Sequence, residues 1–71
     1  MDEIKITIHT EYITLGQFLK FASIIGNGGQ AKAFLAQNKV LVNGEEDNRR
    51  GRKLRNGDQV TILGRTYGIV G

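Results

Sequence analysis

Five of the ten basic residues of the chain lie in one seven-residue basic segment, Arg49-Arg50-Gly51-Arg52-Lys53-Leu54-Arg55. One Asn-Gly pair precedes this segment and another follows it, at Asn43-Gly44 and Asn56-Gly57. Asn-Gly favours tight β-turns, so we expect the segment to be held between folded elements. Arginine guanidinium groups at fixed positions can donate two parallel hydrogen bonds to the oxygens of one phosphate, which lysine cannot do. The pattern therefore predicts a nucleic-acid-binding surface.

The glycines before the second expected helix offer another place for a phosphate. A helix N-terminus presents unpaired N–H groups and a positive dipole end, and glycine lets a phosphate approach the backbone closely. A lysine one turn into that helix adds positive charge on the same side, and the side chain of Asn43 or Gln30 would reach a ribose 2′-hydroxyl. Beyond the five cations of the basic segment, the predicted RNA-binding residues are Lys20, Gly28, Gly29, Gln30, Lys32 and Asn43.

The length and composition indicate one small globular domain over residues 1–71. A net charge of +3 favours a polyanionic partner. The absence of cysteine and the presence of one histidine exclude a disulfide framework and zinc modules of the Cys/His type. No signal sequence and no apolar run of about 20 residues is visible, so we expect a cytoplasmic protein without membrane contact. We also expect the protein to be a monomer.

The sequence gives little support for an enzyme. Gly26-x-Gly28-x-x-Ala31 is similar to a dinucleotide fingerprint, but it follows a helical pattern instead of a strand. His9 and Ser23 are single residues of their kinds, and His9 alternates with strand isoleucines, which indicates simple exposure. Glu45-Glu46-Asp47 lacks the alternate spacing of a calcium loop. We expect neither catalysis nor a cofactor nor a metal.

The first third of the chain predicts a strand followed by a helix. Ile4, Ile6 and Ile8 alternate with polar residues, as in a half-buried strand. Thr14 and Gln17 have the spacing of a capping box at a helix start. Helical spacing then relates the apolar residues Leu15, Phe18, Leu19, Ala22 and Ile25.

A second short helix is expected over about 29–38, with Asn38 as a left-handed terminator. Its apolar face holds Ala31, Phe34 and Leu35. The remaining chain alternates in β fashion around the Asn-Gly turns, with a hairpin at residues 63–66. We expect the first strand to join this small antiparallel sheet, because an isolated strand leaves backbone groups unpaired. The predicted class is α+β.

Taken together, two short helices, then Val40-Leu41-Val42-Asn43-Gly44, a basic connection and Gly57-Asp58-Gln59-Val60 resemble the S-four RNA-binding domain, or alpha-L motif. The resemblance covers about residues 13–63. The chain is most similar to small stand-alone members of the YaaA type, which implies RNA binding and ribosome maturation. Where many members begin the second helix with Ser-Arg, this chain has Gly29-Gln30-Ala31-Lys32, so Lys32 is the implied substitute cation.

Two functions of different classes remain at this point. One is a non-catalytic RNA-binding protein that recognises structured RNA, in particular ribosomal RNA, through phosphate and shape contacts. Tyr12 and Tyr67 are too scattered to form a platform for stacking bases, which favours shape over sequence. The alternative is an adapter whose basic segment docks on an acidic protein. An adapter would show an exposed apolar patch, for which only Phe21 and Ile24 are candidates.

Overall fold

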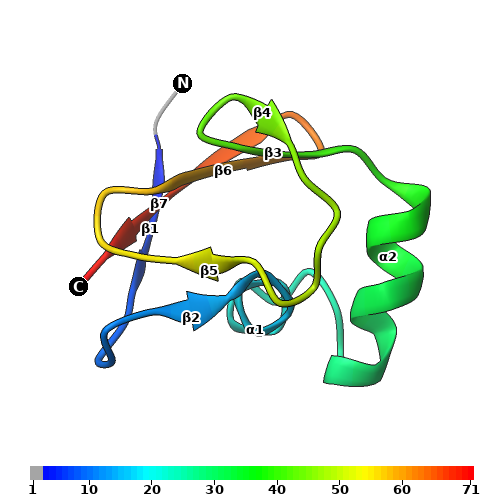
Figure 1. The fold of residues 1–71 in the computed structure, drawn as a ribbon, viewed down its shortest axis with the longest axis horizontal. Coiled ribbons are helices and arrows are strands. Elements are labelled where there is room, and N and C mark those ends of the chain that lie inside the picture. Colours follow the sequence, from blue (N-terminus) through cyan, green and yellow to red (C-terminus); the bar gives the residue numbers. More distant parts are fainter. Residues whose placement is uncertain (1–2) are drawn as a thin grey trace.

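The last strand of the chain lies beside the first one, which gives the main sheet its order. The computed structural model describes residues 3–71. Its five-stranded sheet has the order β1-β7-β6-β3-β4, and β2 and β5 form a separate two-stranded sheet. In Figure 1, α1 and the β2–β5 pair lie below the main sheet, and α2 stands at one end of it. The elements are β1 (Ile4–Thr7), β2 (Ile13–Thr14), α1 (Leu15–Phe21), the 3₁₀ turn η1 (Gly28–Gln30), α2 (Ala31–Gln37), β3 (Val40–Val42), β4 (Glu45–Glu46), β5 (Lys53–Leu54), β6 (Gln59–Ile62) and β7 (Arg65–Val70).

The α+β class is confirmed, but the main sheet is mixed instead of antiparallel. β1 joins it as expected, yet it pairs in parallel with β7, with Ile4 opposite Tyr67 and Ile6 opposite Ile69. Parallel neighbours need a long crossover connection, and here the helices and the remaining strands provide it. The isoleucine alternation is only partly reflected in burial, because Ile8 is buried and Ile4 is exposed.

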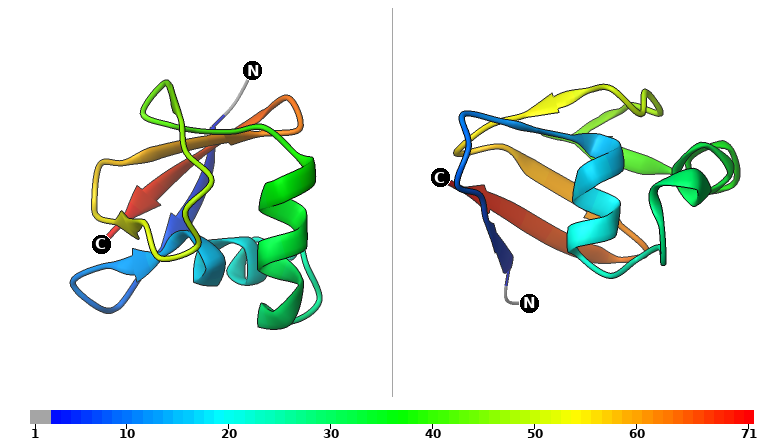
Figure 2. Two further views of the ribbon diagram at one scale, coloured as in Figure 1. Left: turned by 45° about the vertical axis from the view of Figure 1, so that its right-hand side comes forward. Right: turned by 90° about the horizontal axis from the view of Figure 1, so that it is seen from below.

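α1 begins as the sequence predicts and ends earlier. The Gln17 amide N–H donates to Thr14 Oγ1 (3.2 Å), and the Thr14 N–H donates to Gln17 Oε1 (2.9 Å), which completes the capping box. The helix stops at Phe21, and Ser23 then adopts a positive φ of 59°. Ile25 therefore belongs to the loop after α1, and its side chain enters the core from that loop and not from the helix. Figure 2 shows α1 lying against the sheet.

α2 differs from the prediction at both ends. The segment before it forms η1, so the α-helix itself begins at Ala31 and not at Gly29. The prediction of a left-handed Asn38 is wrong, because its backbone is extended, with φ −129° and ψ 141°. Asn38 ends the helix differently: its N–H and its side-chain amide both donate to the Phe34 carbonyl oxygen, at 2.9 and 3.0 Å.

The turns of the sheet follow the glycine signals. Asn43 and Gly44 have φ of 53° and 86°, and Leu63 and Gly64 have φ of 53° and 77°. Two consecutive positive φ values are typical of the hairpin turns whose twist matches the flanking strands. The predicted hairpin at residues 63–66 is thus confirmed, with β7 beginning at Arg65.

One apolar core lies between the sheet, the helices and the β2–β5 pair. Phe18 is fully buried, and its ring meets that of Tyr67 edge-on, with centroids 5.2 Å apart. Phe34 is partly buried against the same core. Since Tyr67 is 5% exposed, it belongs to the core and is closed to any base.

Candidate nucleic-acid interface

The basic segment is tied to the start of α1 and is not a free loop. A turn at residues 50–51 is followed by β5, which pairs with β2 through Ile13 opposite Leu54 and Thr14 opposite Lys53. The N–H groups of Leu15 and Gly16 donate to the carbonyl oxygens of Arg52 (2.8 Å) and Arg50 (2.9 Å). Two N–H groups of the first helical turn, which lack partners inside the helix, are thereby satisfied by the basic segment. The expectation that folded elements hold this segment is confirmed.

Asp47 neutralises part of the charge of the basic segment. Arg49 donates to it from the backbone N–H, from Nε and from Nη2, at 2.9, 3.1 and 2.8 Å. These hydrogen bonds lower the pKa of Asp47 from 3.8 to about 2 and raise that of Arg49. Arg52 Nε lies 3.4 Å from Asp47 Oδ2 and, within the described residues, has no partner of hydrogen-bonding geometry. Arg49 and Arg52 are therefore less available for phosphate than their sequence suggests.

The other three cations of the basic segment make no ion pair within residues 3–71. Two of them flank an exposed aromatic ring: Lys53 Nζ and Arg55 Cζ lie 4.9 and 5.7 Å from the centroid of Tyr12. Such contacts hold flexible cationic side chains to one side of the molecule while leaving their N–H groups accessible. Tyr12 thus supports the cations instead of forming part of a stacking platform.

An open groove of about 410 Å³ brings together cations from distant parts of the sequence. We call it the cationic groove, and its lining residues are Thr14, Gly16, Gln17, Lys20, Gly28, Arg50 and Gly51. Of the predicted site residues it unites Lys20, Gly28 and Arg50, whereas Gly29, Gln30 and Lys32 do not line it. A lysine on α1 and an arginine in the turn at residues 50–51, in a lining that also includes glycines, suit a phosphate ester.

Gly16 was missed as a site residue, although it carried a signal. A Cβ at this position would lie 2.8 Å from Cγ of Arg50 and 3.4 Å from its carbonyl oxygen. Glycine in the first turn of a helix weakens the helix, and one reason for a glycine there is the close approach of another segment. Here that segment is the one that carries Arg50.

The expectation of unpaired N–H groups at the start of α2 is wrong, whereas the role of this segment in RNA binding stays a prediction. The N–H groups of Gly29, Gln30 and Ala31 donate to Asn27 Oδ1, to the Asn27 carbonyl oxygen and to that of Gly28. The Gln30 side-chain oxygen accepts from the Gly26 N–H (2.7 Å). The N–H groups predicted to be unpaired therefore have partners, and Lys32 remains an exposed lysine on a short helix.

Asn43 also belongs to the turn more than to the interface. Its Oδ1 accepts from the Gln59 N–H (2.9 Å), and its Nδ2 donates to Asp58 Oδ1 (3.1 Å). Asp58 in turn accepts from the Arg55 N–H at 2.8 Å, as expected for a turn residue. This network joins the β3–β4 turn to the start of β6 and explains Asn43 without RNA.

Within residues 3–71, no group of three or more acidic, histidine or cysteine side chains is placed to hold a metal ion. None of the helices in that part of the chain has both the length and the apolar character that crossing a membrane requires.

The fold agrees with the family to which the chain belongs. Residues 6–70 match the S4 domain family, and the chain is a member of it. The resemblance predicted from residues 13–63 is thereby confirmed and extends nearly to both ends. The chain is also similar to "Probable ribosome maturation protein RlbA" of Bacillus subtilis (strain 168), with 64% identity over 59 residues, which are 83% of this chain and 83% of that relative.

Proposed function

We propose that this protein binds structured RNA without catalysing a reaction, and that its target is ribosomal RNA during ribosome maturation. The observation that carries the proposal is the convergence of Lys20 and Arg50 on the cationic groove. Lys53 on β5 and Arg55 directly after it add two further cations close by in the chain. The similarity to a probable ribosome maturation protein supports the choice of RNA.

The mode of recognition follows from the chemistry of this surface. The cations of this surface suit phosphate groups. The basic segment that carries most of them is held by backbone hydrogen bonds to α1 and by the pairing of β2 with β5. Contacts of this kind fix register on a nucleic acid without reading its sequence. A surface that is fixed in shape therefore favours A-form helices and their junctions.

A competition experiment tests this proposal. A labelled, folded ribosomal RNA fragment is displaced by an unlabelled copy, by an unstructured RNA of equal length, and by duplex DNA. We expect the folded fragment to compete best. Better competition by the unstructured strand would contradict recognition by shape, and equal competition by DNA would contradict the RNA assignment. If an acidic protein displaced the labelled fragment and none of the nucleic acids did, the result would favour the adapter function.

A further inference from the structure

We propose that a pocket between α1 and the segment joining β1 to β2 receives an unpaired nucleobase of the bound RNA. This base pocket has a volume of about 720 Å³ and is lined by residues 7–14 together with Gln17 and Phe21. The proposal rests on the RNA-binding function above and specifies which RNA feature the protein selects.

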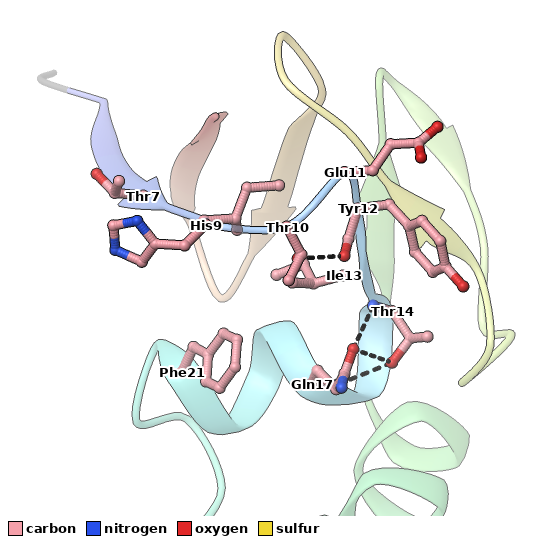
Figure 3. Close-up of a pocket in the computed structure, with 10 residues that line it drawn as sticks. Thr7, His9, Thr10, Glu11, Tyr12, Ile13, Thr14, Gln17 and Phe21 are labelled. Atoms are coloured by element: carbon pink, nitrogen blue, oxygen red, sulfur yellow. Dashed lines mark hydrogen bonds between the residues drawn. The ribbon is translucent and has the colours of Figure 1, made fainter.

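The base pocket has an aromatic surface that the core does not use. Phe21 is the last residue of α1, and 55% of it is exposed. Figure 3 shows its ring below the β1–β2 segment, with the His9 side chain above it and to its left. An exposed phenylalanine beside a pocket is a stacking surface for a base, since every base has a π-face. No lysine or arginine is among the described lining residues, so the chemistry favours a base over a phosphate here.

The base pocket lies next to the cationic groove. Thr14 and Gln17 line both, and Lys20 and Arg50 lie on the groove side of them. A strand whose phosphates follow the groove would therefore bring its bases to the opening of the pocket. This shared boundary favours an RNA base as occupant over a free small molecule or an unrelated apolar peptide.

Gln17 supplies a polar group with a fixed orientation. Its Oε1 accepts from the Thr14 N–H and lies 3.3 Å from Thr14 Oγ1, which establishes which end of the amide is the oxygen. The Gln17 amide nitrogen then donates to no other residue in the described part of the chain. Such a positioned donor matches a carbonyl or ring-nitrogen acceptor on a base edge.

The opposite wall of the pocket is also held in place. Thr10 Oγ1 donates to the Tyr12 carbonyl oxygen (2.7 Å), and the Ile8 N–H donates to the Val70 carbonyl oxygen (2.7 Å). A base therefore meets a preformed opening and little ordering entropy opposes its binding.

The test compares two hairpin RNAs that differ only in one bulged 2-aminopurine, measured by anisotropy and by 2-aminopurine fluorescence. We expect the wild type to bind the bulged RNA about tenfold more tightly, with a change in fluorescence on stacking. Phe21→Ala removes this advantage and the fluorescence change, whereas Phe21→Trp keeps both. Leu63→Ala removes another exposed apolar side chain, in the β6–β7 turn, and leaves the advantage intact.

Several outcomes would overturn the base pocket. One is equal binding of both hairpins by the wild type. Another is a Phe21→Ala variant that has a native circular dichroism spectrum and still prefers the bulged hairpin as strongly as the wild type does. Either result would leave the RNA-binding function standing, whereas failure to bind any RNA would contradict both. A Phe21→Ala variant that keeps the bulge preference but no longer sediments with ribosomal particles would assign the pocket to a protein side chain and overturn it as a base site.

Discussion

Asp47 determines how much positive charge the basic segment offers to a ligand. Its carboxylate accepts three hydrogen bonds from Arg49 and lies within 4 Å of Arg52. Two arginines and one aspartate then act together as roughly one net positive charge. The same contacts hold the turn that presents Arg50. Asp47 therefore both reduces the positive charge of the basic segment and fixes the position of its backbone.

This role predicts the pH dependence of an Asp47→Asn variant. The folded pKa of Asp47 is depressed to about 2 by the Arg49 hydrogen bonds, so its contribution to stability is present above the unfolded pKa. We expect Asp47→Asn to lower the free energy of unfolding at pH 7 by on the order of 1 kcal/mol, since the ion pair is partly screened by solvent.

The difference between the two proteins should shrink as the pH falls from about 4 to about 2, where the wild-type carboxylate becomes protonated. Denaturant melts across this range measure it. Glu45→Gln is the control, because Glu45 is exposed and makes no ion pair among the described residues. An equal effect in both variants would show that only net charge matters.

We propose Arg50 as the arginine of the basic segment that contacts RNA most directly. It lines the cationic groove and makes no ion pair within residues 3–71. We expect Arg50→Ala to weaken binding of folded RNA by several-fold, about the effect of one phosphate contact. Arg65→Ala removes the same charge from the exposed start of β7 and should cost little. Equal losses in the binding isotherms of the two variants would contradict a localised site.

At the scale of elements, the first turn of α1 and the basic segment form one unit. Gly16 allows Arg50 to pass close to the helix, and the Arg50 carbonyl oxygen accepts from the Gly16 N–H. We expect Gly16→Ala to reduce RNA affinity, since the added Cβ displaces the Arg50 side chain, even though alanine favours the helix by about 1 kcal/mol.

Gly51→Ala is the matched control for this variant, because nothing lies within 4 Å of a Cβ at Gly51. Thermal melts first establish that both variants fold. Filter binding then measures whether the RNA affinity of Gly16→Ala is lower than that of Gly51→Ala. Unchanged affinity in Gly16→Ala would show that the Arg50 side chain has a second position that is equally effective.

The helix faces also differ in what they contribute. Lys20 on α1 lines the cationic groove and Lys32 on α2 does not, although the family resemblance predicts Lys32 as the substitute cation. We expect Lys20→Glu to weaken RNA binding more than Lys32→Glu. Lys5→Glu should have the weakest effect of the three, because no residue of β1 lines the cationic groove and Lys5 pairs with Glu3. A stronger effect of Lys32→Glu would restore the site predicted from the sequence.

Local signals account for the elements that the sequence predicted. The capping box of Thr14 and Gln17 and the Asn-Gly turns depend on neighbouring residues, so they can be recognised without the fold. The β2–β5 pair could not be predicted, since strands of two residues show no periodicity. The direction of β1 depends on the path of the whole chain, and the partners of Asn43 and Arg49 depend on side chains that only folding brings near.

At the scale of the whole molecule, one small core supports two adjoining surfaces. Leu15, Phe18 and Leu54 are fully buried, and they join α1 and β5, whose exposed sides carry the cations. Loss of this packing would release the basic segment. Net charge alone, at +3, is too small to specify a target, so the arrangement of the free cations matters more than their number.

That arrangement predicts the salt dependence of binding. Lys20, Arg50, Lys53 and Arg55 make no ion pair in the described part of the chain and are the expected phosphate contacts. About four contacts give a slope of about −3 to −4 in a plot of log affinity against log salt concentration. Arg50→Ala should reduce the magnitude of the slope by nearly one, because one counterion fewer is released. A slope near zero in the wild type would contradict phosphate recognition, and a wild-type slope retained in Arg50→Ala would place the RNA on another face.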